Sequence, residues 1–433
     1  MANGNKKAIS NPSISNLATM FPPPSTNPLE RLNVTDGLLM NADRWRRSHE
    51  YHRQRQNIHY QSLNQPGIVS GLGVHLISPP ADVAPQFRDG RWLQIQPGIA
   101  IDLMGNPIVV PEPIEFRVSG EMAQNPQMVY LVVSYVDPEK LRRKESREFE
   151  RETFRIDEKM APPSDLEVEL CRILLQPEAE QLENPKDVFF PTVNSLDLRY
   201  RTVARSRPAA VVRVAHIMRS QPADERSFTN LSYLLDSVAA LYPSLQGEDP
   251  IGRVTLADSK ISDYDLLYLT GKRSLYLNQQ EFEALRNYLD TGGILLVDAP
   301  TDAINLIESV MAITQQLGTP LEDIKRLSRN HPLRTKPFLF AALPTLNNQQ
   351  IQIGYGGGII LVIGELSAAW GLDDKLLLSR ETIRTAQELG INLLHFAQAR
   401  RQMSQLIKAG SVVAIAPETP VSKRQAIFDK LQF

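Results

Sequence analysis

The chain has 433 residues, of which 42% are hydrophobic and 22% are charged, a balance typical of globular proteins with two or three domains. Its 47 Lys and Arg residues nearly balance 49 Asp and Glu residues, and the net charge of −2 argues against a general nucleic-acid binder. The single cysteine, Cys171, excludes an intramolecular disulfide and a zinc site built from cysteines.

Residues 1–30 combine Asn, Ser and a run of three prolines, a composition that predicts a disordered leader. The alternative is a docking arm that becomes ordered on a partner. Lys6 and Lys7 are not followed by an apolar run of signal-peptide length, and the chain has no apolar stretch of about 20 residues. We therefore expect a cytoplasmic protein that is attached to a membrane, if at all, only through its partners.

A helix is predicted next, with Asn41 as its cap. It mixes arginines with aromatic residues, and Trp45, Arg46, Tyr51 and Arg53 form the candidate protein interface. The alternatives are a solvated amphipathic helix whose arginines pair with acidic neighbours, and a helix that binds nucleic acid. The near-neutral chain argues against nucleic acid as a partner.

Three histidines of the same helix, His49, His52 and His59, raise the question of a metal site. Neither Asp43 nor Glu50 supplies a third ligand on their face. We expect no metal site and no cofactor.

Residues 66–200 are predicted to be rich in β-strands. Short apolar segments flank Gly105-Asn106-Pro107 as in a strand–turn–strand unit. Residues 128–136 predict a buried strand, and residues 168–175 a further strand that contains Cys171. The charged run from Glu139 to Lys159 is typical of a solvated helix or of a long charged hairpin. Residues 31–200 are thus expected to form a helix plus a β-rich assembly domain.

Residues 201–208 are interpreted as a linker, with the main boundary near Pro208. From 209 to 402 apolar strands alternate with helices, which predicts a parallel sheet covered on both faces. The local signals include a strand over 266–270, a capping box at Asn278 and Glu281, and a long helix from about 380 to 401. Residues 403–433 are expected to be a C-terminal tail.

The glycine cluster at 354–358 does not fit a phosphate-binding loop. Ile359 stands where a dinucleotide fingerprint needs its last glycine, and a strand rather than a helix follows. The cluster instead predicts a tight hairpin between two strands.

One candidate crevice lies at the carboxyl ends of the predicted parallel strands, where such sheets bind ligands. Asp298 ends a strand, and Asp302, Asp258 and His331 are the side chains most suited to join it there. The favoured alternative makes Asp298 and Asp302 capping residues of the following helix.

Residues 209–402 resemble a bacterial family of uncharacterised domains related to the class I glutamine amidotransferase-like, flavodoxin-like fold. The resemblance is carried by Thr270-Gly271, by Leu285-Arg286-Asn287-Tyr288-Leu289 and by Gly292-Gly293 with its strand to Asp298, and it continues at Asn330-His331-Pro332. It implies a doubly wound parallel sheet. True amidotransferases carry a nucleophilic cysteine on an elbow, and this half of the chain contains no cysteine. The resemblance therefore implies the fold and not the activity.

Residues 31–200 are similar to proteins encoded with phage tail-like contractile injection systems. The matching segments include Asp36-Gly37, Tyr51-His52-Arg53, residues 67–74, residues 96–102 and residues 105–110. The resemblance implies an accessory structural protein of the baseplate or crown type, as in cyanobacterial particles, where such a component helps to hold the particle at an internal membrane.

Taken together, these features predict a non-enzymatic structural component that assembles as a homo-oligomer with baseplate, sheath or tube proteins. The alternative function is an α/β hydrolase or a small-ligand sensor that uses Asp298 and His331.

Overall fold

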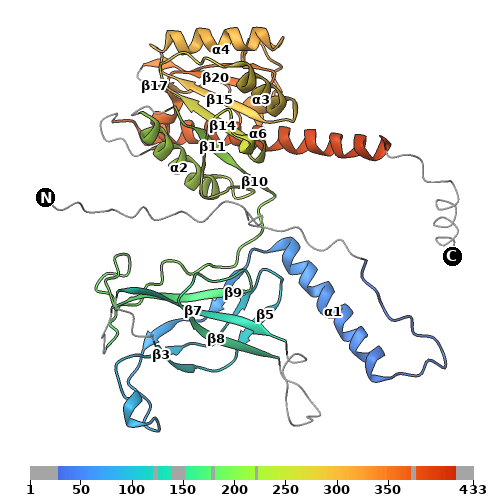
Figure 1. The fold of residues 1–433 in the computed structure, drawn as a ribbon, viewed down its shortest axis with the longest axis vertical. Helices are drawn as coiled ribbons and strands as arrows, with labels where there is room; N and C mark the ends of the chain where they lie inside the picture. The colour runs from blue at the N-terminus through green and yellow to red at the C-terminus, as the bar shows by residue number, and fades with distance from the viewer. Residues whose placement is uncertain are drawn as a thin grey trace. The chain divides into compact units, whose positions relative to one another are not determined.

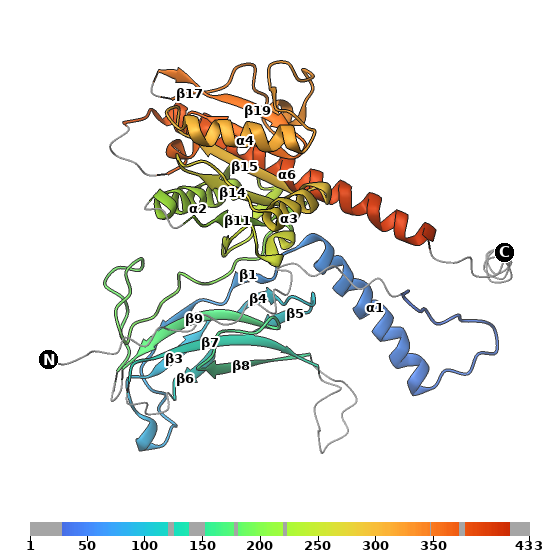
Figure 2. The ribbon, with the colours of Figure 1, turned by 45° about the horizontal axis from the view of Figure 1, so that its top comes forward.

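The computed structural model describes residues 28–119, 125–137, 152–176, 181–219, 223–346, 348–371 and 377–415. Residues 1–27 of the predicted leader (1–30) and most of the charged run from Glu139 to Lys159 lie outside these ranges. The chain divides into two compact units, residues 1–207 (unit 1) and residues 208–433 (unit 2). Both units, seen in Figures 1 and 2, contain helices and sheets, so the fold is mixed α/β.

Unit 1 consists of one long helix and three small antiparallel sheets, with strand orders β1-β4-β5, β2-β3-β6 and β8-β7-β9. Alternate strand residues point inward and form one apolar core, in which Cys171 is completely buried. The elements are α1 (Ala42–Leu63), β1 (Gly67–Gly71), β2 (Val74–Leu76), η1 (Pro85–Phe87), β3 (Trp92–Ile95), β4 (Gly98–Ile101), β5 (Pro107–Val110), β6 (Ile114–Arg117), β7 (Gln127–Val136), β8 (Thr153–Lys159) and β9 (Glu167–Leu175).

Unit 2 is built on a seven-stranded mixed sheet of order β13-β11-β14-β15-β20-β19-β16. The first five strands are parallel, and β19 and β16 are antiparallel to their neighbours. The first half of the unit contains β10 (Ala210–Val212), β11 (Val214–Ile217), α2 (Ala223–Leu241), β12 (Leu245–Gly247), β13 (Gly252–Val254), η3 (Ser259–Asp263), β14 (Leu266–Thr270), α3 (Gln279–Asp290) and β15 (Ile294–Ala299). The second half contains α4 (Ile304–Gln316), β16 (Glu322–Asp323), α5 (Pro332–Thr335), β17 (Thr345–Leu346), β18 (Gln349–Gln350), β19 (Gln352–Gly356), β20 (Ile359–Ile363), η4 (Leu366–Ala369) and α6 (Arg380–Ile415).

Helices cover both faces of this sheet because its central strands are apolar on both sides. Residues of α2 and α6 pack with one set of alternating strand residues, and residues of α3 and α4 pack with the other set. Because the first five strands are parallel, their carboxyl ends lie at the same edge of the sheet. Asp298 lies at this edge.

Several local predictions are confirmed. Asn41 caps α1, and the capping box of Asn278 and Glu281 begins α3. The glycine cluster forms the hairpin between the antiparallel strands β19 and β20, with positive φ at Gly357 and Gly358.

The predicted tail is corrected in part. Helix α6 continues to Ile415, well beyond the expected end near Arg401. Residues 402–415 contain Gln, Met, Leu, Lys and Ala, which are good helix formers, and the first proline after them is Pro417. Figures 1 and 2 both show this end of α6 projecting beyond the sheet of unit 2.

Candidate functional site

Helix α1 carries all four residues of the candidate interface. It has 22 residues, and none of them is buried. The Asn41 side chain accepts a hydrogen bond from the Arg44 amide (2.9 Å) and so satisfies a donor at the helix start. A polar helix of this length owes its stability to a few anchoring contacts with its own unit, and most of its surface is left exposed.

The four interface residues divide into two pairs. Trp45 is 59% exposed and its ring lies edge-on to His49, while Arg46 forms an exposed ion pair with Asp43 (2.8 Å). Tyr51 is half-buried. The Arg53 guanidinium forms an ion pair with the carboxylate of Asp137, the residue after β7 (3.0 Å). The structure therefore places Trp45 and Arg46 on the free surface and turns Arg53 toward the body of unit 1.

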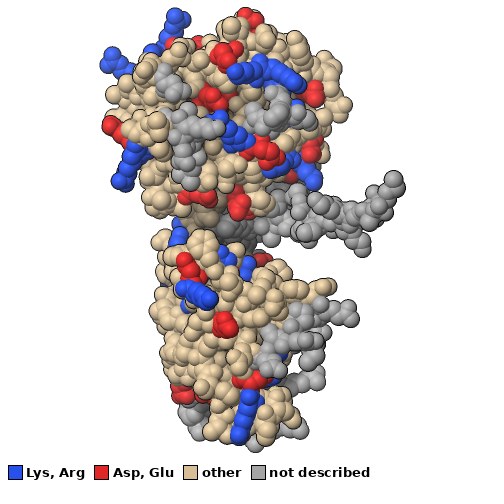
Figure 3. Space-filling view, turned by 90° about the vertical axis from the view of Figure 1, so that its left-hand side faces the viewer, with Lys and Arg blue, Asp and Glu red and all other residues tan. Residues whose placement is uncertain are grey.

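The basic character of α1 is reduced by pairing inside the chain. Arg46 pairs with Asp43, and Arg53 pairs with both Asp137 and Glu50. Figure 3 shows a face other than that of α1, and there Lys and Arg side chains are interspersed with Asp and Glu. A nucleic-acid interface usually needs a clear basic stripe, so the protein-interface interpretation is favoured.

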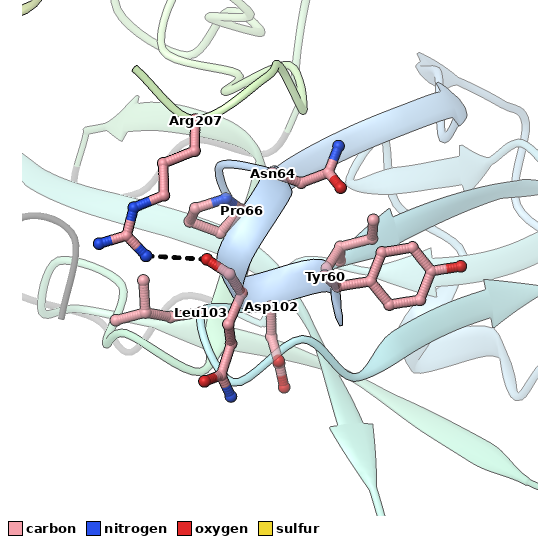
Figure 4. Close-up of a pocket in the computed structure, with 8 residues that line it drawn as sticks. Tyr60, Asn64, Pro66, Asp102, Leu103 and Arg207 are labelled. Atoms are coloured by element: carbon pink, nitrogen blue, oxygen red, sulfur yellow. Dashed lines mark hydrogen bonds between the residues drawn. The ribbon is translucent and has the colours of Figure 1, made fainter. Parts of the chain in front are cut away.

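The C-terminal half of α1 is anchored at a small cavity (Figure 4). The Arg207 guanidinium donates a hydrogen bond to the Gln61 carbonyl in the last turn of the helix (2.8 Å). Its positive charge also interacts favourably with the negative end of the helix dipole. The Asn57 and Asn106 amides are 2.9 Å apart in a hydrogen bond, and the Gln61 amide donates to the Met104 carbonyl. The cavity of about 10 Å³ holds roughly one water molecule and is too small for a ligand.

The candidate crevice in unit 2 is filled by the protein itself at Asp298. This side chain is fully buried at the end of β15. Its carboxylate accepts hydrogen bonds from the amides of Leu366 and Ser367 at the start of η4 (both 2.8 Å) and from the Tyr268 hydroxyl (3.2 Å). Burial raises the pKa of Asp298, and the hydrogen bonds from Ser367, Leu366 and Tyr268 oppose that shift.

Asp302 and His331 have separate partners. Asp302 is exposed and pairs with Lys272 (2.5 Å), whose hydrogen bond lowers the pKa of Asp302. His331 caps α5 through a hydrogen bond from the Leu333 amide (3.3 Å), and its ring packs between Tyr355 and Phe396. Burial lowers the pKa of His331. Among the residues that the structure describes, no contact links Asp298 to either of them.

The predicted capping role is wrong for both aspartates. The N-cap of α4 is Ala303, which makes no side-chain cap, and Asp298 instead accepts the N-terminal amides of η4. Asp258, the fourth residue considered for the crevice, caps η3 through the Lys260 amide (2.9 Å).

Sequence reasoning also missed Glu365, next to η4, which has a positive φ of 52° and a pKa raised by burial and by the Asp298 charge.

A hollow of about 380 Å³ lies at the amino ends of the parallel strands of unit 2 and was not predicted. Arg213, Asp265 and Arg401 line it, together with glutamines of α6. Asp265 accepts a hydrogen bond from the Arg213 amide (2.8 Å), while burial raises the pKa of Asp265 to about 6. The only sequence signal was a carboxylate directly before an apolar strand.

The raised pKa of Asp265 predicts a pH-dependent stability. The native state holds the Asp265 proton up to about pH 6, whereas an unfolded aspartate releases its proton near pH 4. The native state therefore binds more protons between these values, and stability falls as the pH rises through this window. Urea titrations at pH 4.5 and 7.5 measure the free energy of unfolding. Between these pH values it should fall by about 1–3 kcal/mol less in Asp265→Asn than in the wild type. Asp263→Asn, an exposed change in the same hollow, should keep the wild-type profile, and an identical profile for Asp265→Asn would contradict the assignment.

Comparison with protein families gives a match to a family model within unit 2. Residues 211–398 match the model of a family described as a domain of unknown function (DUF4159), which covers less than half of the chain. No curated protein shows significant similarity to the chain.

Two solved structures show weak likenesses. The crystal structure of TssK has 12% sequence identity and a TM-score of 0.24, over 49% of this chain and 48% of TssK. A cytoplasmic protein from Salmonella typhimurium has 13% identity and a TM-score of 0.23, over 43% of this chain and 98% of its own. The chain thus spans about half the length of TssK, and both scores are too low to define a shared fold.

The described residues lack two further features. They contain no helix that is long and apolar enough to cross a membrane. They also contain no group of three or more His, Cys, Asp or Glu side chains suited to hold a metal ion.

Proposed function

We propose that the protein is a non-enzymatic structural subunit of a phage tail-like contractile injection system, placed near its baseplate. Its partners in this proposal are baseplate, sheath or tube proteins and further copies of itself. The observation that carries the proposal is helix α1, which has no buried residue and is anchored through its C-terminal half. Such a helix is stable enough to present Trp45 and Arg46, which are residue types common at interface hot spots.

Unit 2 is proposed to be a flavodoxin-like domain of the amidotransferase-related type. Numbered along the chain, its five parallel strands have the order 2-1-3-4-5, and helices lie on both faces. This is the order of flavodoxin-like sheets, which supports the proposal. The antiparallel strands β19 and β16 extend the sheet beyond that pattern.

The domain is proposed to serve as a structural module without catalysis. It contains no cysteine nucleophile, and the buried Asp298 carboxylate, at the sheet edge where parallel α/β sheets bind ligands, accepts hydrogen bonds from the domain's own backbone. The particle is proposed to lie in the cytoplasm, with membrane attachment made through other subunits.

The test is a double variant in the native host, Trp45→Ala with Arg46→Ala, followed by particle purification and mass spectrometry. We expect the variant to fold and to be depleted at least tenfold from particles, because it loses two exposed side chains and no buried contact. The matched control is Tyr276→Ala with Arg273→Ala, an exposed aromatic and arginine pair of unit 2. Incorporation of the α1 variant at the control level would overturn this contact, and a tagged protein that never copurifies with tail-shaped particles would overturn the function.

A further inference from the structure

We propose that an extended peptide segment of a partner protein, carrying a basic residue, adds as a strand to the free edge of β10 in unit 2. The site is the hollow of about 380 Å³ at the amino ends of the parallel strands. The inference goes beyond the proposed function, in which helix α1 makes the contact with other subunits.

Strand β10 is paired on one side only. The Ala210 amide donates to the Ser244 carbonyl (3.1 Å), and the Val212 carbonyl accepts from the Glu248 amide (3.0 Å). The backbone groups of Ala210 and Val212 therefore face β12, the parallel neighbour of β10. Successive residues of a strand direct their backbone groups to opposite sides, so the amide and the carbonyl of Val211 point away from β12. Among the strands that the structure describes, none pairs with β10 on that side.

The residues before β14 explain why this edge is free. In the register of β11 and β14, residues 262–264 would lie beside β10, but the chain there ends the short helix η3, which Asp258 caps. Arg213, directly after β10, is paired from this side by Asp265. Its amide donates to the Asp265 carboxylate (2.8 Å), and its carbonyl accepts from the Asp265 amide (2.9 Å). Val211 lies two residues earlier on the same side and lines the hollow.

The hollow has the size and the lining that a short extended segment needs. Its volume is within the roughly 300–1,000 Å³ of ligand sites. Besides Val211, the lining includes the end of η3 and three side-chain amides that share one face of α6, namely Gln398, Gln402 and Gln405. Side-chain amides both donate and accept hydrogen bonds, so they suit the backbone of a peptide. A strand added to an open edge obtains its affinity from main-chain hydrogen bonds of this kind.

The two arginines of the hollow are engaged within the chain. Arg213 forms an ion pair with Glu248 (2.8 Å). Arg401 is only 7% exposed, and its guanidinium donates to the backbone carbonyls of Ser262 and Thr291. These contacts occupy donors that an acidic ligand would require, so the arginines do not favour an anionic partner.

The two carboxylates of the hollow keep acceptor capacity. Asp263 is exposed and has no ion-pair partner among the described residues. Asp265 accepts from the Arg213 amide with one of its two oxygens. Carboxylate oxygens form their strongest hydrogen bonds with charged donors, so a Lys or Arg side chain of the peptide fits this side of the hollow.

The test selects seven-residue peptides from a random displayed library on the purified full chain. We expect one enriched family that contains Lys or Arg, and its best member is then made as a synthetic peptide. This peptide should bind about tenfold more weakly to Val211→Pro, which lacks the free amide N–H. Val211→Thr keeps the amide and a branched side chain, and it should bind as the wild type does. Circular dichroism verifies that each variant is folded.

Two further measurements do not depend on the proline variant. Methylating alternate amide nitrogens of the peptide should weaken binding for one set of residues and not for the other, because the two sets face opposite sides of a strand. Gln402→Lys adds a cation to the lining and should weaken binding of the basic peptide. Met403→Lys adds the same charge at an exposed neighbour outside the lining, and it should leave binding unchanged.

A library without an enriched family, an enriched family without basic residues, or unchanged binding in both Val211→Pro and Gln402→Lys would overturn the proposal. Equal exchange protection of the Val211 and Val212 amides in the free chain would mean that the edge is already paired within the chain, and this result would overturn it too. The experiment uses purified protein, so its failure is distinct from failure of the proposed function, which is measured by copurification with particles.

Discussion

Replacing Asp298 by alanine is expected to lower the free energy of unfolding of unit 2 by about 3–5 kcal/mol, because three buried donors lose their acceptor together. The donors are the Leu366 and Ser367 amides and the Tyr268 hydroxyl, and Asp298 itself has no exposed surface. Urea titration followed by the fluorescence of the buried Trp370, which lies beside Tyr268, measures the loss.

Two further variants make this expectation specific. Asp298→Asn should also destabilise unit 2, because one carboxylate oxygen becomes an NH₂ group that faces donors. Asp302→Ala should leave the unfolding curve unchanged, since its ion pair with Lys272 is exposed. Wild-type stability in Asp298→Ala would show that the buried carboxylate is not held as described.

The same carboxylate bears on the alternative function. Parallel α/β sheets bind ligands beyond the carboxyl ends of their strands, often through backbone amides. Here two such amides are directed at the chain's own side chain. A thermal-shift screen with nucleotides, sugars and amides should therefore find no saturable stabilisation, and a ligand whose effect disappears in Asp298→Asn would instead support the hydrolase or sensor.

Local signals predicted much of unit 2. The strand over residues 266–270, the capping box at Asn278 and the glycine hairpin each depend on residues close together in sequence, and all three are present. The role of Asp298 depends on residues 68 and 69 positions later, so the nearby helix α4 was the wrong partner. No pattern around Asp298 indicates that η4 would return to it.

The candidate interface shows the same limit. The sequence placed Trp45, Arg46, Tyr51 and Arg53 on one helix, and α1 confirms that placement. Which of them faces solvent depends on Asp137, 84 residues away from Arg53. Helical periodicity cannot supply that information, because α1 lacks the apolar stripe that would mark an inner face.

Removing two of the anchors of α1, by Arg53→Met with Arg207→Met, should expose its backbone amides without unfolding the rest of unit 1. The variant loses the Arg53–Asp137 ion pair and the Arg207 cap on the Gln61 carbonyl. Both arginines are partly solvated, so the loss is expected to total about 1–3 kcal/mol, which corresponds to a drop in protection of about 5- to 150-fold. Hydrogen exchange resolved by peptide measures α1 separately from β7 and β9, whose protection should not change.

Arg55→Met, an exposed change on the same helix, is the matched control and should leave the exchange of α1 as in the wild type. The double variant should also enter particles poorly although it retains Trp45 and Arg46, because an interface helix that is not held in one orientation must be ordered when it binds. Unchanged protection of α1 would mean that other contacts hold the helix. Reduced protection with normal particle incorporation would mean that its orientation does not matter for assembly, and the role of Trp45 would then rest on its side chain alone.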